Sequence, residues 1–304
     1  KSNYDRINRY SGKHVGTGIS CGIDSLSTIK YHFDDEEMEE YRLDTLVLLN
    51  AGFYGYDEAS HSRSQKYVKQ AEEFAAEKKL PMIFVDSNVA GFYDGELDKW
   101  HTWLCTGIIL MMQNYFSKYY MASAGYPYEL SMDIEDDATY DLYLLNTVSN
   151  FNLSFISGCH FMLRNDKTQY LLLSQEYRKH IYVCTSEYSG MNCGRCKKCI
   201  RTLLDAESIG QIDSLSERFH IDYFKKHTNS YWGYALRRRR DHYYPNTIRH
   251  YKQNGGHIGL KAYINAVLPN QFDKFYYTKL IYHKLEKRRL IGIILKYFRR
   301  IAGK

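Results

Sequence analysis

The sequence predicts an α/β fold with a parallel β-sheet, followed by a helical C-terminal extension. Short apolar runs alternate with longer segments whose apolar residues recur at helical spacing. Such alternation is typical of parallel sheets whose strands are buried on both faces by helices. Beyond about residue 215, aromatic and basic residues are mixed, and the segments are predicted to be helical. We therefore expect two domains, residues 1–214 and residues 215–304.

Each predicted element rests on its own pattern. The predicted strands are short apolar runs, and the predicted helices are longer segments with helical spacing of apolar residues. We expect strands at His14–Ser20, Thr45–Asn50, Met82–Asp86, Phe155–Ser157 and Ile181–Cys184. We expect helices at Asp24–Phe33, Ser64–Lys79, Thr106–Met121 and Lys198–Glu207.

The amino-acid composition indicates which class of protein this is. Hydrophobic residues make up 44% of the 304 residues and charged residues 25%, as in ordinary soluble globular proteins. No apolar stretch approaches the roughly 20 residues that span a bilayer, and no secretory signal pattern is visible. Four of the seven cysteines are clustered, which favours metal binding in a reducing compartment over a disulfide framework. We expect a cytoplasmic protein.

The positive charge is concentrated at the C-terminal end. The formal net charge is +6, but Phe275–Lys304 holds nine basic residues against one acid (net +8), so residues 1–274 sum to −2. Apolar residues recur among these cations, a pattern close to that of a basic amphipathic helix on an anionic membrane or on nucleic acid. Peripheral membrane contact through residues 275–304 is one expectation. A helix docked on its own domain, with a solvated basic face, explains the same pattern.

Residues Gly18–Ser25, with the sequence GISCGIDS, lie between a predicted strand and a predicted helix. A turn in this position directs backbone N–H groups and hydroxyls toward an anion, and the following helix adds its positive end. Ser20 and Ser25 offer hydroxyls for phosphate oxygens. Gly22 allows close backbone approach or a positive φ angle. Asp24 suits a helix start or a ligand to Mg²⁺. An ordinary capped strand–helix turn would use the same residue types.

The loop has neither the lysine nor the spacing of a Walker A motif, which disfavours a kinase-type nucleotidase. It resembles instead the Ser-Gly-Gly-x-Asp-Ser signature of PP-loop ATP pyrophosphatases, with Cys21 in place of the first glycine. The resemblance implies a Rossmann-like (HUP-type) domain. It also implies a nucleotide-binding loop made of Ser20, Cys21, Gly22, Ile23, Asp24 and Ser25.

Cys184, Cys193, Cys196 and Cys199 have the spacing of a metal site. Two C-x-x-C steps in tandem form a knuckle whose backbone N–H groups support thiolates, and a distant fourth cysteine completes tetrahedral coordination. A closed four-cysteine site has no open position, so we predict structural zinc that joins a strand end to the helix over Lys198–Glu207. An iron–sulfur cluster is the alternative metal centre.

This cysteine spacing resembles the zinc site of 7-cyano-7-deazaguanine synthases, which are PP-loop enzymes. The order of the two motifs along the chain is also similar, and together they bracket residues 14–207. Arg164 and Lys167 resemble a basic Arg-x-x-Lys-Thr element of such relatives, which implies that they neutralise phosphate charge during the reaction. A solvated basic loop explains the same two residues.

Asn50 follows the second predicted strand, where PP-loop enzymes commonly place residues around adenine. The substrate-recognition residues of the deazaguanine enzymes are matched poorly. The acidic residues at that place are Asp133, Glu135, Asp136 and Asp137. The acceptor substrate is therefore not carried over from that family.

The resemblance implies a ligase-type enzyme that uses ATP, Mg²⁺ and Zn²⁺. AMP is transferred to a carboxylate or carbonyl oxygen of a small molecule, pyrophosphate leaves, and ammonia or another nucleophile then displaces AMP. The expected catalytic residues are Asp24, Ser25, Arg164 and Lys167. The sequence leaves open the acceptor, the nucleophile and whether the chain forms a homodimer.

Two alternatives remain at this stage. A tRNA-thiolating PP-loop enzyme would need a reactive cysteine among Cys21, Cys105 and Cys159. A zinc-dependent nucleic-acid-binding module without catalysis would use the cysteine knuckle, the run Arg237–Arg240 and the basic tail, and its binding would depend steeply on salt.

Overall fold

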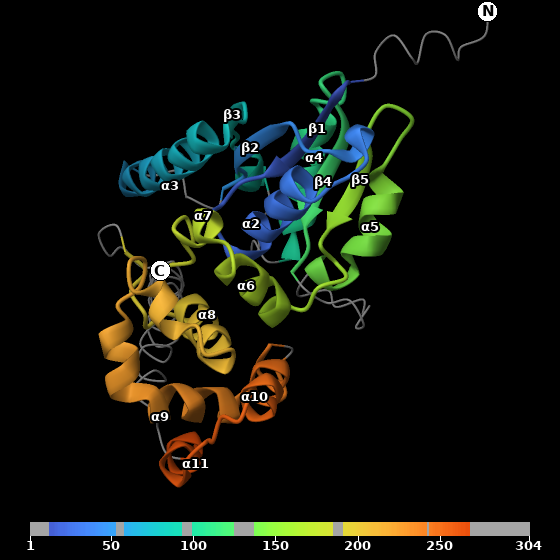
Figure 1. Cartoon of the computed structure of the whole chain (residues 1–304). Coiled ribbons are helices and arrows are strands. Elements are labelled where there is room, and N and C mark those ends of the chain that lie inside the picture. Colours follow the sequence, from blue (N-terminus) through green and yellow to red (C-terminus); the bar gives the residue numbers. More distant parts are fainter. Residues whose placement is uncertain are drawn as a thin grey trace, which may run out of the picture.

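The protein is built around a five-stranded parallel sheet. A computed structural model describes residues 12–52, 58–92, 99–124, 137–184, 191–241 and 243–267. The strand order is β3-β2-β1-β4-β5, and every pairing is parallel (Figure 1). The strands are β1 (His14–Gly18), β2 (Thr45–Asn50), β3 (Met82–Asp86), β4 (Phe116–Ala122) and β5 (Ser154–Gly158).

The helices lie between the strands and after the last one. The α-helices are α2 (Ile23–Ile29), α3 (Glu58–Lys78), α4 (His101–Leu110), α5 (Asp141–Val148), α6 (Arg164–Leu172), α7 (Gln175–Arg178), α8 (Lys197–Ser208), α9 (Ile221–Arg237), α10 (Tyr244–Gln253) and α11 (Leu260–Val267). The shorter elements are the π-helix η1 (Lys30–Asp34) and the 3-10 turns η2 (Glu39–Tyr41), η3 (Val89–Phe92), η5 (Asp137–Tyr140) and η6 (Ile212–Leu215).

Helices cover both faces of the sheet, so the apolar core has two parts. On one face, Leu46 and Leu48 of β2 pack in a cluster with residues of α2, α3, α6 and α8. On the other face, Val47 of the same strand packs with residues of α4 and α5. Side chains alternate along a strand, so β2 serves both clusters. The α/β class predicted from the sequence is confirmed.

The sheet reverses its winding direction at β1. The chain passes from β1 to β2 and β3 on one side, and then to β4 and β5 on the other. The carboxyl ends of β1 and β4, at Gly18 and Ala122, therefore lie beside each other where the two connections diverge. In open parallel sheets this switch point is the usual place of a ligand cleft.

A glycine lets the helix after β1 approach the sheet closely. A Cβ atom on Gly158, the last residue of β5, would lie 2.4 Å from Cγ2 of Thr28 in α2. Real Cβ contacts are longer, so a side chain at this position would push α2 away from the sheet. The close packing of α2 fixes the loop that precedes it.

One predicted helix is wrong, because its second half is a central strand of the sheet. The helix predicted over Thr106–Met121 ends at Leu110 as α4, residues 111–115 form a turn, and β4 follows. A continuous apolar run does not distinguish a helix from a buried strand. Tertiary structure decides here, because β4 pairs with β1 on one side and with β5 on the other.

Two predicted strands also need correction. Ile181–Cys184 forms no strand, because its backbone bonds to side chains and a loop: Val183 N and Cys184 N donate to Oδ1 of Asn192 at 2.8 and 3.1 Å. Met82–Asp86 is a strand as predicted, but it lies at the edge of the sheet rather than inside it, and Phe84 is 45% exposed.

Helices follow the sheet domain, as predicted, in the described residues beyond 215. They lie beyond α8, at the opposite end from β1 in Figure 1. Phe219, Phe224 and Tyr231 belong to the same apolar cluster as Leu46 of β2. The division at residue 214 stays a prediction. Within the described part of the chain, no helix combines the length and the hydrophobicity needed to cross a bilayer.

Candidate functional site

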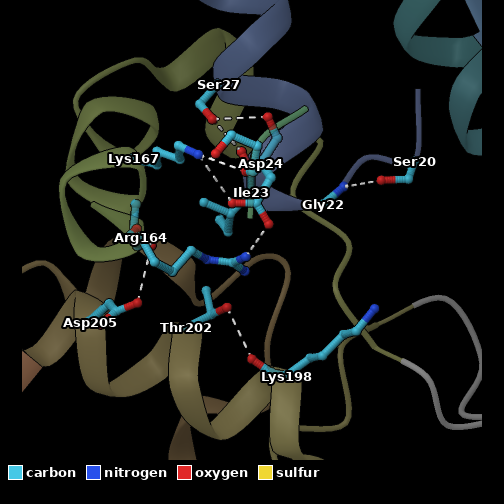
Figure 2. Close-up of polar contacts among 12 residues, drawn as sticks. Ser20, Gly22, Ile23, Asp24, Ser27, Arg164, Lys167, Lys198, Thr202 and Asp205 are labelled. Carbon is cyan, nitrogen blue, oxygen red and sulfur yellow. Dashed lines mark hydrogen bonds and ion pairs between the residues drawn. The ribbon is translucent and has the colours of Figure 1, made fainter. Parts of the chain in front are cut away.

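The loop between β1 and α2 is held by its own serine hydroxyls. Ser25 Oγ donates to the carbonyl oxygen of Gly18 at 2.8 Å and accepts from Ser20 N at 3.1 Å. Gly22 N donates to Ser20 Oγ at 3.3 Å (Figure 2). The hydroxyl of Ser25 therefore shapes the turn, while the residues of the loop other than Cys21 line the cavity described below.

The strained position of the loop is Cys21, not Gly22. Cys21 has a φ angle of 55°, in the left-handed region that favours glycine, whereas Gly22 has an extended φ of −78°. Of the two possibilities that a glycine at position 22 allows, close backbone approach and a positive φ, the positive φ is not used. Cys21 is held there because its carbonyl oxygen accepts Tyr182 N at 2.8 Å and its side chain is buried in the core.

Asp24 lies in the first turn of α2 and is surrounded by cations. Nη1 of Arg164 donates to its Oδ2, and Nζ of Lys167 lies 3.7 Å from its Oδ1 (Figure 2). Burial raises the pKa of Asp24, but the positive charges of Arg164 and Lys167, with Arg201 and Lys198, outweigh it and hold the pKa below its ordinary value. Asp24 is therefore an anion at neutral pH.

The element Arg164–Thr168 is not a solvated basic loop. It forms the first turns of α6, with Arg164 9% exposed and Lys167 fully buried. Lys167 Nζ donates to the carbonyl oxygen of Ser123, next to the end of β4, at 2.7 Å. The first turns of α6 thus carry two cations to the carboxylate at the start of α2.

Two further cations, which the sequence analysis missed, come from α8. Lys198 and Arg201 are three positions apart and line the same cavity as the loop. Arg201 is 7% exposed, and its guanidinium carbon lies 3.7 Å from the ring centroid of Tyr243. A detectable signal exists in the sequence, because Lys198 lies between Cys196 and Cys199, Arg201 follows Cys199 by two positions, and their spacing of three places them on one helix face.

The loop and these cations open into one cavity of about 860 Å³. Its floor includes the ends of β1 and β4, and its other walls come from α6, from α8 and from Tyr182–Cys184. Of the described residues that line it, Asp24 is the only acid. The volume lies within the range of small-molecule and cofactor sites.

Asn50 does not line this cavity. Its side-chain nitrogen donates to Oδ1 of Asp86 at 2.7 Å, and its side-chain oxygen accepts Gly52 N at 3.1 Å. The side chain therefore links the ends of β2 and β3 and shapes the turn after β2. Gly52, with a φ of 97°, is the residue of this turn that reaches the cavity.

A buried carboxylate supports the cations from behind. Asp205 of α8 is 2% exposed and accepts hydrogen bonds from Thr247 at 2.6 Å and Thr168 at 3.3 Å. Burial raises its pKa to about 6, while these hydrogen bonds and the charges of Arg164 and Arg201 limit the rise. Asp205 thus ties α6, α8 and α10 together beneath the arginines.

The four clustered cysteines are buried and close enough to share one ion. Their Sγ atoms all lie within 4.8 Å of one another, and those of Cys193 and Cys199 are 3.9 Å apart. A tetrahedral site with metal–sulfur bonds of about 2.3 Å needs separations of roughly 3.8 Å. Arg195 N and Cys196 N point at Cys193 Sγ, at 3.4 and 3.3 Å, as in a metal knuckle. The chain therefore has a four-cysteine cluster able to hold a metal such as zinc.

Hydrogen bonds among the four cysteines divide their pKa values. Those with the Cys184 side chain lower the pKa of Cys193 and of Cys196, whereas the pKa of Cys184 is raised by the bond with Cys193 and that of Cys199 by the bond with Cys184. Asn192 is fully buried and holds the backbone on either side, since its Nδ2 also donates to the carbonyl oxygens of Ile181 and Arg218. Cys184 is both a member of the cluster and part of the cavity wall.

The remaining cysteines are buried thiols. Burial raises the pKa of Cys21, Cys105 and Cys159 to about 12 in each case. They are protonated at neutral pH, and a protonated thiol is a poor nucleophile.

Several sequence-based expectations fall outside the described residues. These are the acidic positions Asp133, Glu135 and Asp136, and the basic tail 275–304. Asp137 is described and is buried; its Oδ2 accepts Thr102 N at 2.6 Å and so caps the start of α4. In the run Arg237–Arg240, Arg237 Nε donates to the carbonyl oxygen of Ala266 at 2.8 Å, whereas Arg239 and Arg240 are exposed.

Comparison of the chain with models of known protein families, with curated proteins and with solved structures found no match.

Proposed function

We propose that this protein is an ATP-cleaving, adenylating enzyme of the PP-loop class. The observation that carries the proposal is the pair of buried cations of α6, Arg164 and Lys167, that faces the single acid of a serine-lined loop. Lys198 and Arg201 of α8 line the same cavity as this loop. That loop stands at the switch point of a parallel sheet and opens into a cavity of about 860 Å³. A concentration of positive charge beside a turn of this kind suits a polyphosphate.

The residues divide into shaping and charge-bearing groups. Ser20 and Ser25 hold the turn, and the backbone of residues 20–25 faces the phosphates. Arg164 and Lys167 stabilise negative charge as the bond between the α- and β-phosphates breaks. Because they are buried, their charges act in a medium of low polarity, where such stabilisation is strongest.

Asp24 fits a Mg²⁺ ion that is bound together with the nucleotide. Mg²⁺ in nucleotide sites is usually held by one or two carboxylates and by substrate phosphates. Asp24 is the only acid among the described lining residues, it is 26% exposed, and its Oδ1 is buried without a hydrogen-bond partner. When bound, the ion neutralises phosphate charge and orients the leaving group.

The reaction follows from these roles. A carboxylate or carbonyl oxygen of the acceptor attacks the α-phosphorus of ATP, the bond from that phosphorus to the bridging oxygen breaks, and pyrophosphate leaves with the bond electrons. The acyl adenylate, or its carbonyl counterpart, is then attacked by ammonia or another nucleophile. AMP leaves, and the nucleophile gives up a proton. Positioning and charge stabilisation supply the catalysis.

We infer that the four-cysteine cluster holds zinc in a structural role. Four buried sulfur ligands leave no open coordination position, and tetrahedral sulfur sites favour zinc or iron–sulfur centres. Metal analysis of the purified protein distinguishes these two, because zinc is colourless and an iron–sulfur cluster absorbs visible light.

The alternatives have less support. A sulfur-transferring enzyme needs a thiolate, and the three cysteines outside the cluster have a pKa raised to about 12 by burial. A nucleic-acid-binding module would use exposed cations; in the run Arg237–Arg240, Arg239 and Arg240 are exposed, whereas Arg237 donates to the backbone of α11. A cavity of about 860 Å³ whose described lining combines one acid with three Lys and Arg side chains supports a small-molecule site.

The test is to identify the nucleotide product. The protein is incubated with ATP, Mg²⁺ and a small-molecule cell extract, beside Asp24→Ala and the matched control Asp213→Asn, an exposed acid away from the cavity. AMP and pyrophosphate from the wild type and the control, with loss in Asp24→Ala, support the proposal. ADP and phosphate would overturn it.

A further inference from the structure

Arg201 is a buried arginine with two unpartnered guanidinium nitrogens. It is 7% exposed and lines the cavity, and its Nε and Nη1 atoms are buried without a hydrogen-bond partner. Buried donors are nearly always satisfied, so unpartnered donors of an arginine in a cavity wall indicate that a ligand supplies the acceptor.

The guanidinium group of Arg201 is held in position by a neighbouring aromatic ring. Its guanidinium stacks on the ring of Tyr243, with 3.7 Å from the central carbon to the ring centroid. Stacking on an aromatic face fixes the plane of a guanidinium while its edges remain free for oxygen ligands. Tyr243 stands directly before α10, so the segment beyond residue 215 contributes to the cavity.

Lys198 lies on the same helix face, three positions earlier, and also lines the cavity. Figure 2 shows its side chain extended from α8 toward the side on which Ser20 and Gly22 lie, with Arg164 between α8 and Asp24. The two α8 cations therefore stand on a wall of their own, separate from the loop and from α6.

The balance of cations and acids around the cavity determines which ligand the α8 wall can bind. Asp24 is already the partner of Arg164 and Lys167, and Asp205 adds one negative charge behind the arginines. Four cations near two acids leave positive charge uncompensated. A single carboxylate supplies one negative charge, whereas the terminal phosphates of a nucleotide supply several and accept hydrogen bonds on every side.

We propose that α8 is the second half of the polyphosphate site: Lys198 and Arg201 bind the terminal phosphates, opposite the loop, and hold pyrophosphate when it leaves. This inference rests on the proposed function and adds to it the residues that recognise the leaving group. The wall is rigid because Cys196 precedes α8 and Cys199 lies in its first turn, so metal ligands and phosphate-binding cations alternate along the same turns.

The test measures the binding of pyrophosphate, ATP and AMP by calorimetry, in the presence of Mg²⁺, to the metal-loaded protein. Arg201→Gln and Lys198→Gln each weaken pyrophosphate and ATP binding by about 10- to 100-fold, because each removes a charged hydrogen-bond donor. AMP binding stays unchanged, because AMP has no terminal phosphates. The matched controls are Arg195→Gln and Lys197→Gln, which are exposed neighbours outside the cavity lining.

Each outcome has a definite meaning. Pyrophosphate binding at wild-type strength in both α8 variants overturns the inference and leaves the proposed function intact. Equal losses for AMP and pyrophosphate also overturn it. A wild type that binds neither ATP nor pyrophosphate overturns the proposed function as well. If Arg201→Gln does not fold, Lys198→Gln, which alters an exposed side chain, provides the same test.

Discussion

The two walls of the cavity are built in opposite ways. The loop wall, residues 18–25, is held by its own backbone and hydroxyls: Ser25 bonds to Gly18 and Ser20, and the carbonyl oxygen of Cys21 accepts Tyr182 N. The α8 wall starts from four cysteines whose thiolates repel one another unless a metal binds them. We therefore expect the loop wall to form with the sheet, and the α8 wall to depend in addition on a metal bound by these cysteines.

Under the proposed function, a metal in the cluster would do more than link parts of the chain. Cys184 belongs both to the cluster and to the cavity wall, Lys198 lies between Cys196 and Cys199, and Arg201 follows Cys199 by two positions. We expect metal binding to set the position of these two cations without any contact between metal and nucleotide.

Removal of the metal should unfold the α8 wall and leave the loop wall folded. Structural zinc sites contribute about 10 kcal/mol or more of apparent binding free energy, so chelation should unfold the knuckle and α8 and abolish pyrophosphate binding. Amide hydrogen exchange by mass spectrometry should rise steeply in residues 191–208 and remain low in β1, and zinc addition should restore the original pattern. Unchanged exchange in α8, or an equal rise in β1, would contradict the division into two walls.

Asp24→Asn should stop the chemistry and leave the metal site intact. Loss of the carboxylate removes the proposed Mg²⁺ ligand and the anion that Arg164 and Lys167 face, so ATP cleavage should fall by about 100- to 1,000-fold, as when other preorganised charges are removed. The measurements are the rate of AMP release and the zinc content of the same sample. A variant that cleaves ATP at the wild-type rate would remove Asp24 from the mechanism.

Asp205 should make stability depend on pH. Burial raises its pKa from 3.8 to about 6, so the folded state binds this proton more tightly than the unfolded state does. The stability that Asp205 contributes is fully present below about pH 4 and is lost as pH rises through 6, by up to about 3 kcal/mol.

Urea unfolding of the wild type and Asp205→Asn between pH 4 and pH 7 measures this term. The free energy of unfolding of the wild type minus that of Asp205→Asn should fall as pH rises, because only the wild type loses a proton at this position. Parallel profiles would show that Asp205 has an ordinary pKa, and that it does not support the arginines from a buried site.

The smallest effect is expected from the cysteines outside the cluster. Cys105→Ser and Cys159→Ser should leave the rate of ATP cleavage within about a factor of three of the wild type, because burial keeps both thiols protonated. Loss of activity with normal folding in either variant would revive sulfur transfer and weaken the role of the charged walls.

Much of the fold could be predicted from sequence patterns, and the failures have a common cause. Thr45–Asn50 is a strand with the predicted bounds, and Lys198–Glu207 is a helix extended by one residue at each end. The segment Phe116–Ala122 was missed because its apolar residues continue those of α4, and only pairing with β1 and β5 makes it a strand. Ile181–Cys184 fails because a side chain, Asn192, bonds to its backbone.

The site was predictable where residues follow one another in the chain. The loop residues and the four cysteines come together as their spacing predicts, and Arg164 and Lys167 meet Asp24 across the fold. Arg201 and its partner Tyr243 were missed because their contact joins segments far apart in sequence. Asn50 follows β2 as predicted, but its side chain bonds to Asp86. The direction of a side chain depends on tertiary neighbours, which residue spacing does not encode.

A crystal structure of the zinc-loaded protein with Mg²⁺ and the α,β-methylene analogue of ATP would test the two-walled site most directly, because this analogue cannot be cleaved between its α- and β-phosphates. We expect a triphosphate between residues 20–25 and α8, with Lys198 and Arg201 on the terminal phosphates and Asp24 beside Mg²⁺. A nucleotide bound elsewhere, or one whose terminal phosphates point away from α8, would contradict it.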